Sequence, residues 1–237
     1  MANEIAILMA AGLGTRMAPL TEKIPKPLVK VHGERMIETV IKGLRRRGVC
    51  KIYVVVGYKG EQFEFLTEKY PEVSLVQNEE YIVKNNISSI YAVCDVLGTA
   101  NCFICEADLY VSDVSIFDAV LTQSCYYGKL VEGLSDDWVF DTDSETGRIT
   151  RVGKGGTDVY NMVGVSYFLK DDAKIISDAI KEAYLYPGHE QLYWDEIVDK
   201  NLHCLDMIVH PVNEEQIVEI DSVAELEIVD PEYAKFN

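Results

Sequence analysis

Two glycines and two cations near the N-terminus have the types and spacing for phosphate chemistry. An apolar run through Met9 leads into Ala10-Ala11-Gly12-Leu13-Gly14-Thr15-Arg16, and Lys26 follows between two prolines. A glycine-rich loop after a strand exposes backbone N–H groups that can surround a polyphosphate, and two cations can neutralise it. We predict a nucleoside-triphosphate site, with Arg16 and Lys26 as catalytic residues and with these binding residues: Ala10, Ala11, Gly12, Gly14, Thr15 and Arg16.

The loop differs from the two commoner phosphate-binding motifs. A P-loop needs Gly-Lys-Ser/Thr at its end, which this loop lacks. A dinucleotide fingerprint needs a third glycine where Met17 stands. A Gly-x-Gly turn alone is weak evidence, so the interpretation depends on Arg16 and Lys26 occurring together with it.

Carboxylates that could hold a metal ion occur at two distant places. Asp108 follows a predicted strand at 102–105, and Glu219 and Asp221 lie near the C-terminus. A carboxylate at the carboxyl end of a strand suits a hard cation, and alternate residues of a strand project on one face. Asp108 can equally cap the following turn, and Asp221 can equally cap the C-terminal helix.

The elements that must position these residues alternate along the first half of the chain. The predicted strands are 5–9, 51–56, 73–77 and 102–105, and the predicted helices are 35–47, 61–69 and 87–96. Such alternation predicts an α/β fold with a doubly wound, mostly parallel sheet. Ligands of such sheets bind beyond the carboxyl ends of the strands, where the glycine loop lies.

The second half of the chain has a different pattern. Strands with hairpin-like breaks are predicted at 125–131, 138–141, 149–152 and 162–168. Helices follow at 171–183 and 192–200, and the tail from Asp221 is helical again. This part is therefore expected to add small antiparallel pieces to the sheet.

Composition limits the class of protein. The 237 residues, 48% of them hydrophobic, can bury a sizeable core, and no linker or repeat divides them, so one domain is predicted over 1–237. The net charge of −17 argues against nucleic acid and against an anionic membrane surface as partners. No run has the length of a transmembrane segment or a signal peptide core, so a cytoplasmic location is expected. Cys102 and Cys105 are expected to be free thiols on a buried strand.

The stretches Leu-Met-Ala-Ala-Gly-Leu-Gly-Thr-Arg-Met-x-Pro-Leu-Thr and Ile-Pro-Lys-Pro-Leu-Val give the chain a family resemblance. It resembles the sugar-phosphate nucleotidyltransferases. The resemblance implies a Rossmann-like domain, with the nucleotide bound by about residues 1–110 and the acceptor by about residues 111–237. It also implies Mg²⁺ as cofactor, held by Asp108, Asp221 and Glu219, with Asp108 as a third catalytic residue.

Further segments, spread from Val56-Gly57-Tyr58-Lys59 to Glu219-Ile220-Asp221-Ser222, are similar to one branch, the bacterial phosphocholine cytidylyltransferases. This similarity implies transfer of CMP from CTP to phosphocholine, giving CDP-choline and pyrophosphate. Alternative acceptors are 2-aminoethylphosphonate, another small phosphorylated amine and a sugar 1-phosphate. A non-catalytic nucleotide-binding regulatory module is a further alternative, and the sequence leaves the oligomeric state open.

Aromatic side chains near a carboxylate suit an acceptor with a quaternary ammonium group. Trp138, Tyr193 and Asp195 are predicted to bind it, with Tyr160 and Tyr167 as further possibilities, although a single aromatic residue more often packs in a core. By resemblance, Lys154 is expected to bind the acceptor phosphate, although its glycine-rich surroundings differ from the Glu-Lys-Pro pattern of the sugar enzymes.

Recognition of the base is assigned to polar residues after the third predicted strand. They are Asn78, Asn86 and Ser88. Asn86 and Ser88 can alternatively cap the helix that follows them.

Overall fold

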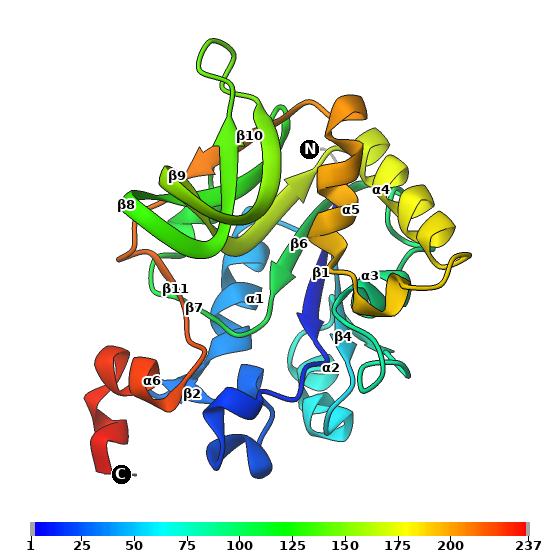
Figure 1. The fold of residues 1–237 in the computed structure, drawn as a ribbon. Coiled ribbons are helices and arrows are strands. Elements are labelled where there is room, and N and C mark those ends of the chain that lie inside the picture. Colours follow the sequence, from blue (N-terminus) through cyan, green and yellow to red (C-terminus); the bar gives the residue numbers. More distant parts are fainter. Residues whose placement is uncertain (1–2, 236–237) are drawn as a thin grey trace.

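A seven-stranded sheet forms the centre of the computed structural model, which describes residues 3–235 (Figure 1). The strand order is β10-β8-β9-β6-β1-β4-β5. Strands β6, β1, β4 and β5 run parallel, β9 is antiparallel to β6 and β8, and β10 is parallel to β8. The bounds are β1 (Glu4–Ala10), β4 (Lys51–Val56), β5 (Val73–Gln77), β6 (Asn101–Glu106), β8 (Ser124–Thr142), β9 (Ile149–Phe168) and β10 (Met207–Pro211).

Helices cover both faces of this sheet, as the predicted doubly wound fold requires. Successive residues of a buried strand point to opposite faces. Leu8 therefore packs in one core cluster with α1, whereas Ile7 packs in a second cluster with α3, α4 and α5. The bounds are α1 (Met36–Arg47), α2 (Phe65–Lys69), α3 (Ile87–Tyr91), α4 (Lys170–Ala183), α5 (Trp194–Asn201) and α6 (Val223–Val229).

A third, smaller core cluster joins the two ends of the chain. Met17 and Met36 from the N-terminal part pack against Ile220 and Leu226 from the C-terminal part. In addition, β7 (Leu109–Val111) pairs antiparallel with β11 (Ile217–Glu219). These contacts bring the acidic residues near the C-terminus to the carboxyl ends of β1 and β6. A separate two-stranded sheet consists of β2 (Lys30–Val31) and β3 (Glu34–Arg35).

The central part of the chain differs in detail from the sequence prediction. The four predicted strands are the ends of two long ones, β8 and β9, whose pairing is interrupted by register shifts. Gly133 and Gly155, with φ of 84° and 74°, adopt the left-handed backbone that such bends favour. The predicted helices at 61–69 and 87–96 are shorter, since regular α-helix covers only α2 and α3, flanked by tighter turns.

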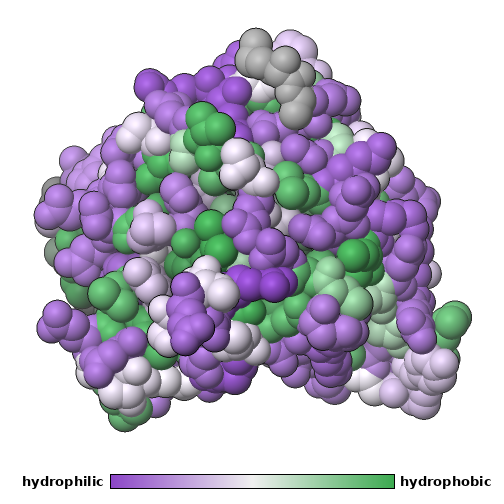
Figure 2. Space-filling model, turned by 90° about the horizontal axis from the view of Figure 1, so that it is seen from above, coloured by the Kyte–Doolittle hydropathy of each residue, from purple (hydrophilic) through white to green (hydrophobic). Residues whose placement is uncertain are grey.

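The surface and the cysteines agree with the composition. On the face shown in Figure 2, hydrophilic residues predominate and hydrophobic residues form small separate groups. Cys102 and Cys105 are buried free thiols, and burial raises the pKa of both. Within residues 3–235, no helix is long and apolar enough to cross a membrane.

Candidate active site

A cavity of about 370 Å³ lies where the parallel strands end, as expected for this type of sheet. We call it the nucleotide cavity, after the ligand that the sequence analysis predicts for its lining residues. All the residues predicted to bind nucleotide line it: Ala10, Ala11, Gly12, Gly14, Thr15, Arg16, Asn78, Asn86 and Ser88. Other lining residues were not predicted, among them Tyr81, Lys84 and Ser89.

The two loop glycines have different roles. Gly14 has φ of 63°, and a Cβ there would lie 2.9 Å from Cβ of Lys26. The hydroxyl of Thr21 donates a hydrogen bond to the Gly14 carbonyl at 2.9 Å, which fixes the turn. A Cβ on Gly12 would meet nothing within 4 Å. Gly14 thus closes the loop onto the segment of Lys26, while Gly12 leaves space above the backbone.

Lys26 is buried at the floor of the nucleotide cavity between two carboxylates. Its Nζ lies 2.7 Å from Oδ2 of Asp108 and 2.5 Å from Oδ1 of Asp221. Arg16 also reaches Oδ1 of Asp221, at 2.8 Å. Burial lowers the pKa of Lys26, but attraction to Asp108 and Asp221 outweighs this and raises it above the ordinary value, so the side chain is a fixed positive charge.

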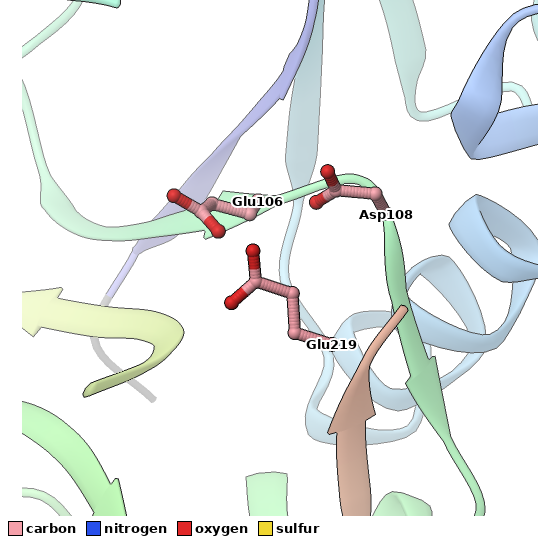
Figure 3. A group of neighbouring side chains, drawn as sticks. All are labelled: Glu106, Asp108 and Glu219. Atoms are coloured by element: carbon pink, nitrogen blue, oxygen red, sulfur yellow. The ribbon is translucent and has the colours of Figure 1, made fainter. Parts of the chain in front are cut away.

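Three carboxylates converge beside this lysine. Ligand oxygens of Glu106, Asp108 and Glu219 lie within 4.8 Å of one another, and Figure 3 shows the Glu219 carboxylate directed toward Glu106. Burial, followed by repulsion from Glu219 and Asp108, raises the pKa of Glu106 well above its usual range. Burial of the Glu219 carboxylate, followed by repulsion from Asp108 and Asp221, raises its pKa to about 8, although the residue as a whole keeps exposed surface.

This acidic group fits a hard divalent cation. Oxygen ligands from several carboxylates suit Mg²⁺, and a cation would relieve the repulsion that, after burial, raises these pKa values. Asp108 and Glu219, which the sequence predicted as ligands, belong to the group. Asp221, the third predicted ligand, lies beside the group, pairs with Lys26 as Asp108 does, and also pairs with Arg16. Ser222, not Asp221, caps α6.

Glu106 is a site residue that the sequence analysis missed. It ends β6 two residues before Asp108, and it lines the nucleotide cavity. Its spacing from Asp108 is the same as that between Glu219 and Asp221, so the same argument about alternate residues would have found it.

A second cavity of about 240 Å³ opens beside the acidic group. We call it the acceptor cavity. It brings together the residues predicted to bind the acceptor: Trp138, Lys154, Tyr193 and Asp195. Trp138 and Lys154 are register partners on β8 and β9, and the rings of Trp138 and Tyr193 meet edge to face with centroids 5.3 Å apart. Lys154 Nζ lies 6.0 Å from the Trp138 ring and 5.8 Å from the Tyr193 ring.

Asp195 is a buried carboxylate on the first turn of α5. Its Oδ1 accepts a hydrogen bond from the Tyr126 hydroxyl at 3.0 Å. Burial raises the pKa of Asp195 to about 7. The further candidates Tyr160 and Tyr167 are not among the residues that line the acceptor cavity, since Tyr160 packs against the second core cluster and Tyr167 bonds to Glu4 and Asn101.

The residues predicted to read the base mainly organise their own loop. Asn78 Nδ2 donates to the hydroxyl of Ser88 at 2.9 Å, and Asn78 Oδ1 accepts from the backbone of Glu80. Tyr81 forms another part of the wall. Its ring lies so close to Gly57 that a Cβ there would approach Tyr81 Cγ to 2.6 Å and the Ala11 carbonyl to 2.9 Å.

The known proteins that this chain resembles in sequence have functions that fit this geometry. A model of the nucleotidyl transferase family matches residues 5–134. The chain is 56% identical over 228 residues to 2-aminoethylphosphonate cytidylyltransferase of Lancefieldella rimae, covering 96% of this chain and 92% of the relative. It is 38% identical to choline-phosphate cytidylyltransferase of Streptococcus pneumoniae, covering 92% of this chain and 93% of the relative.

The fold also agrees with that of a solved structure. The structure of CTP:phosphocholine cytidylyltransferase from Streptococcus pneumoniae matches with a TM-score of 0.88 and 34% identity, over 97% of this chain and 98% of the other. This chain therefore belongs to the nucleotidyltransferase family, and it is an enzyme of that class. Its named relatives at 56% and 38% identity are both cytidylyltransferases.

Proposed function

We propose that this nucleotidyltransferase transfers CMP from CTP to 2-aminoethylphosphonate and releases pyrophosphate. The observation that carries the proposal is the 56% identity to a 2-aminoethylphosphonate cytidylyltransferase along 96% of the chain. The identity to the choline-phosphate enzyme is 38%. The acceptor favoured by the sequence analysis, phosphocholine, thus gives way to its first alternative.

The carboxylates in the acceptor cavity favour an acceptor that carries a primary amine. A primary ammonium group donates three hydrogen bonds, whereas a trimethylammonium group donates none. The acceptor cavity contains the carboxylates of Asp137 and Asp195 in addition to its two aromatic rings. These carboxylates can accept hydrogen bonds from the amine, while Lys154 supplies a positive charge for the phosphonate.

The reaction requires correct positioning of the two substrates and stabilisation of the phosphate charge rather than a protein nucleophile. A phosphonate oxygen forms a bond to the α-phosphorus as the bond from that phosphorus to the bridging oxygen of pyrophosphate breaks, and the leaving group takes the electron pair. Lys26 and Arg16 stabilise the negative charge of the triphosphate. Glu106, Asp108 and Glu219 would hold Mg²⁺, which supplies neutralisation of phosphate charge when bound.

A pyrophosphate-release assay tests the proposal. The four ribonucleoside triphosphates are each combined with 2-aminoethylphosphonate, phosphocholine or a sugar 1-phosphate, with and without Mg²⁺. We expect the highest kcat/KM for CTP with 2-aminoethylphosphonate, and no turnover without a divalent cation. A higher kcat/KM for phosphocholine would contradict the proposed acceptor while leaving the enzyme class intact.

A further inference from the structure

Asn86 lies where the nucleotide cavity and the acceptor cavity meet. Both cavities are lined by Arg16, Asn86, Glu106, Glu219 and Asp221. Three of these are carboxylates, which repel a phosphate group. Arg16 is already paired with Asp221 at 2.8 Å. Asn86 is therefore the uncharged residue of this shared lining that can donate a hydrogen bond.

The orientation of the Asn86 amide is fixed by its own contacts. Its Oδ1 accepts the backbone N–H of Trp194 at 3.0 Å. Because a backbone N–H can only donate, the oxygen must face Trp194, and Nδ2 must face the other way. Within the described part of the chain, no hydrogen-bond acceptor is found for this Nδ2.

The backbone on which Asn86 sits is also held. Asn85 N donates to the Glu190 carbonyl at 2.8 Å, and Asn86 N donates to Oδ1 of Asn85 at 2.8 Å. The segment is thus tied to the chain just before α5, close to Tyr193 at the N-cap of that helix and Asp195 in its first turn. A donor held in this way needs little reorganisation when charge must be stabilised.

We propose that Asn86 Nδ2 donates a hydrogen bond to a non-bridging oxygen of the α-phosphate of CTP and positions the phosphorus for attack. This assignment rests on the proposed function. The junction of the two cavities is where the α-phosphate must lie, because the acceptor oxygen reaches it from one cavity and pyrophosphate leaves on the other side. The non-bridging oxygens carry charge throughout the transfer, so a fixed donor lowers the energy of the transition state.

The test uses Asn86→Ala and Asn86→Asp. The aspartate keeps the oxygen that accepts the Trp194 N–H but lacks the donor, whereas the alanine lacks both. We expect each substitution to lower kcat by about 100-fold, the effect of losing one fixed donor to a developing charge. Thermal denaturation of both variants shows whether they remain folded, and Asn86→Asp, which keeps the contact to α5, is expected to melt near the wild-type temperature.

A phosphorothioate measurement separates donation to the phosphate from a structural role. The two diastereomers of cytidine 5′-O-(1-thiotriphosphate) each replace one non-bridging α-oxygen by sulfur, a weaker acceptor. We expect one diastereomer to be slowed in the wild type by loss of the Asn86 hydrogen bond. In Asn86→Ala that slowing relative to CTP should shrink, while the slowing of the other diastereomer is unchanged.

Glu196→Ala is the matched control, since Glu196 lines neither cavity but accepts the Tyr193 N–H at the start of α5 at 2.7 Å. It should keep a kcat near the wild-type value and unchanged thio effects. The proposal is overturned if Asn86→Ala keeps wild-type kcat, if its thio effects equal those of the wild type, or if Glu196→Ala reproduces its behaviour. Failure of the wild type to use CTP with 2-aminoethylphosphonate would contradict the proposed function instead. The same comparison, made with the nucleotide and acceptor that the wild type does use, would still test Asn86.

Discussion

The nucleotide cavity is lined mainly by continuous segments of the chain, whereas the acceptor cavity is lined by side chains that are far apart in the sequence. The nucleotide cavity is lined largely by the segment from Met9 to Arg16 and by residues between Asn78 and Ser89. The acceptor cavity collects single side chains from β8, β9, α5 and the end of β11. A cavity made from one continuous segment leaves a motif in the sequence. A cavity made from distant side chains can change its ligand through few substitutions, without disturbing the glycine loop.

The largest effect is expected at Lys26, which belongs to the nucleotide side. Lys26→Ala should lower kcat by about 100- to 1000-fold, since a buried charge that stabilises the transition state is lost. Steady-state kinetics with both substrates measures this. Lys23→Ala, which removes an exposed lysine nearby, is the control and should behave as the wild type does. Near-wild-type turnover of Lys26→Ala would remove Lys26 from the catalytic machinery.

A substitution at Glu106 tests the acidic group between the cavities. Glu106→Gln removes one carboxylate of the proposed Mg²⁺ site, so the Mg²⁺ concentration for half-maximal activity should rise by about 10-fold or more. Activity titrated with Mg²⁺ measures this shift. Asp206→Asn, on an exposed aspartate, is the control and should leave the titration curve in place. An unshifted curve for Glu106→Gln would mean that Glu106 does not contribute to holding the cation.

A substitution at Trp138 tests whether the two cavities bind their ligands independently. Trp138→Ala should raise the KM for the aminated acceptor by about 10-fold, the value of one cation–π contact, and leave the KM for CTP unchanged. Tyr186→Ala, on an exposed tyrosine outside both cavities, is the control. If the KM for CTP rose as much as that for the acceptor, the prediction that the two cavities bind their ligands independently would be wrong.

The smallest effect concerns the stability of the acceptor side. Because burial raises the pKa of Asp195 to about 7, the unfolded chain releases this proton at a lower pH than the native protein. The stability that protonated Asp195 provides is complete below about pH 4, the pKa of an unperturbed aspartic acid, and is lost as the pH rises to about 7. Asp195→Asn keeps an oxygen for the Tyr126 hydroxyl and cannot ionise.

The melting temperature of Asp195→Asn should therefore equal that of the wild type near pH 4 and exceed it by roughly 10 °C at pH 8. Thermal denaturation over this pH range measures the difference, and Asp206→Asn should show no such trend. A constant difference between Asp195→Asn and the wild type at every pH would show that Asp195 does not titrate in this range.

The same contrast explains how much the sequence could predict. The parallel part of the sheet and the glycine loop follow from local hydrophobic pattern and spacing, and the structure has them. The short strands β7, β10 and β11 were missed because their stability comes from pairing with distant strands rather than from their own residues. The bends that join four predicted strands into β8 and β9 also depend on pairing between the two.

The candidate site shows a similar division. Lys26, Asp108 and Asp221 were each named from the sequence, but their mutual contacts depend on a core cluster that joins both ends of the chain. Nothing in the local pattern indicates that Asp221 pairs with Lys26, or that Glu106 and Glu219 lie near Asp108. Such pairing depends on distances between side chains, which spacing along one strand does not determine.

Because Tyr81 packs on Gly57, a residue outside the lining of the nucleotide cavity influences the shape of its wall. One methyl group on Gly57 would collide with the aromatic ring and with the Ala11 carbonyl, so the ring would have to shift within the cavity wall. Gly57 lies outside the cavity lining, yet its lack of a side chain sets the position of the Tyr81 ring in the cavity wall. Changes to the shape of this cavity can therefore begin at a position that does not line it.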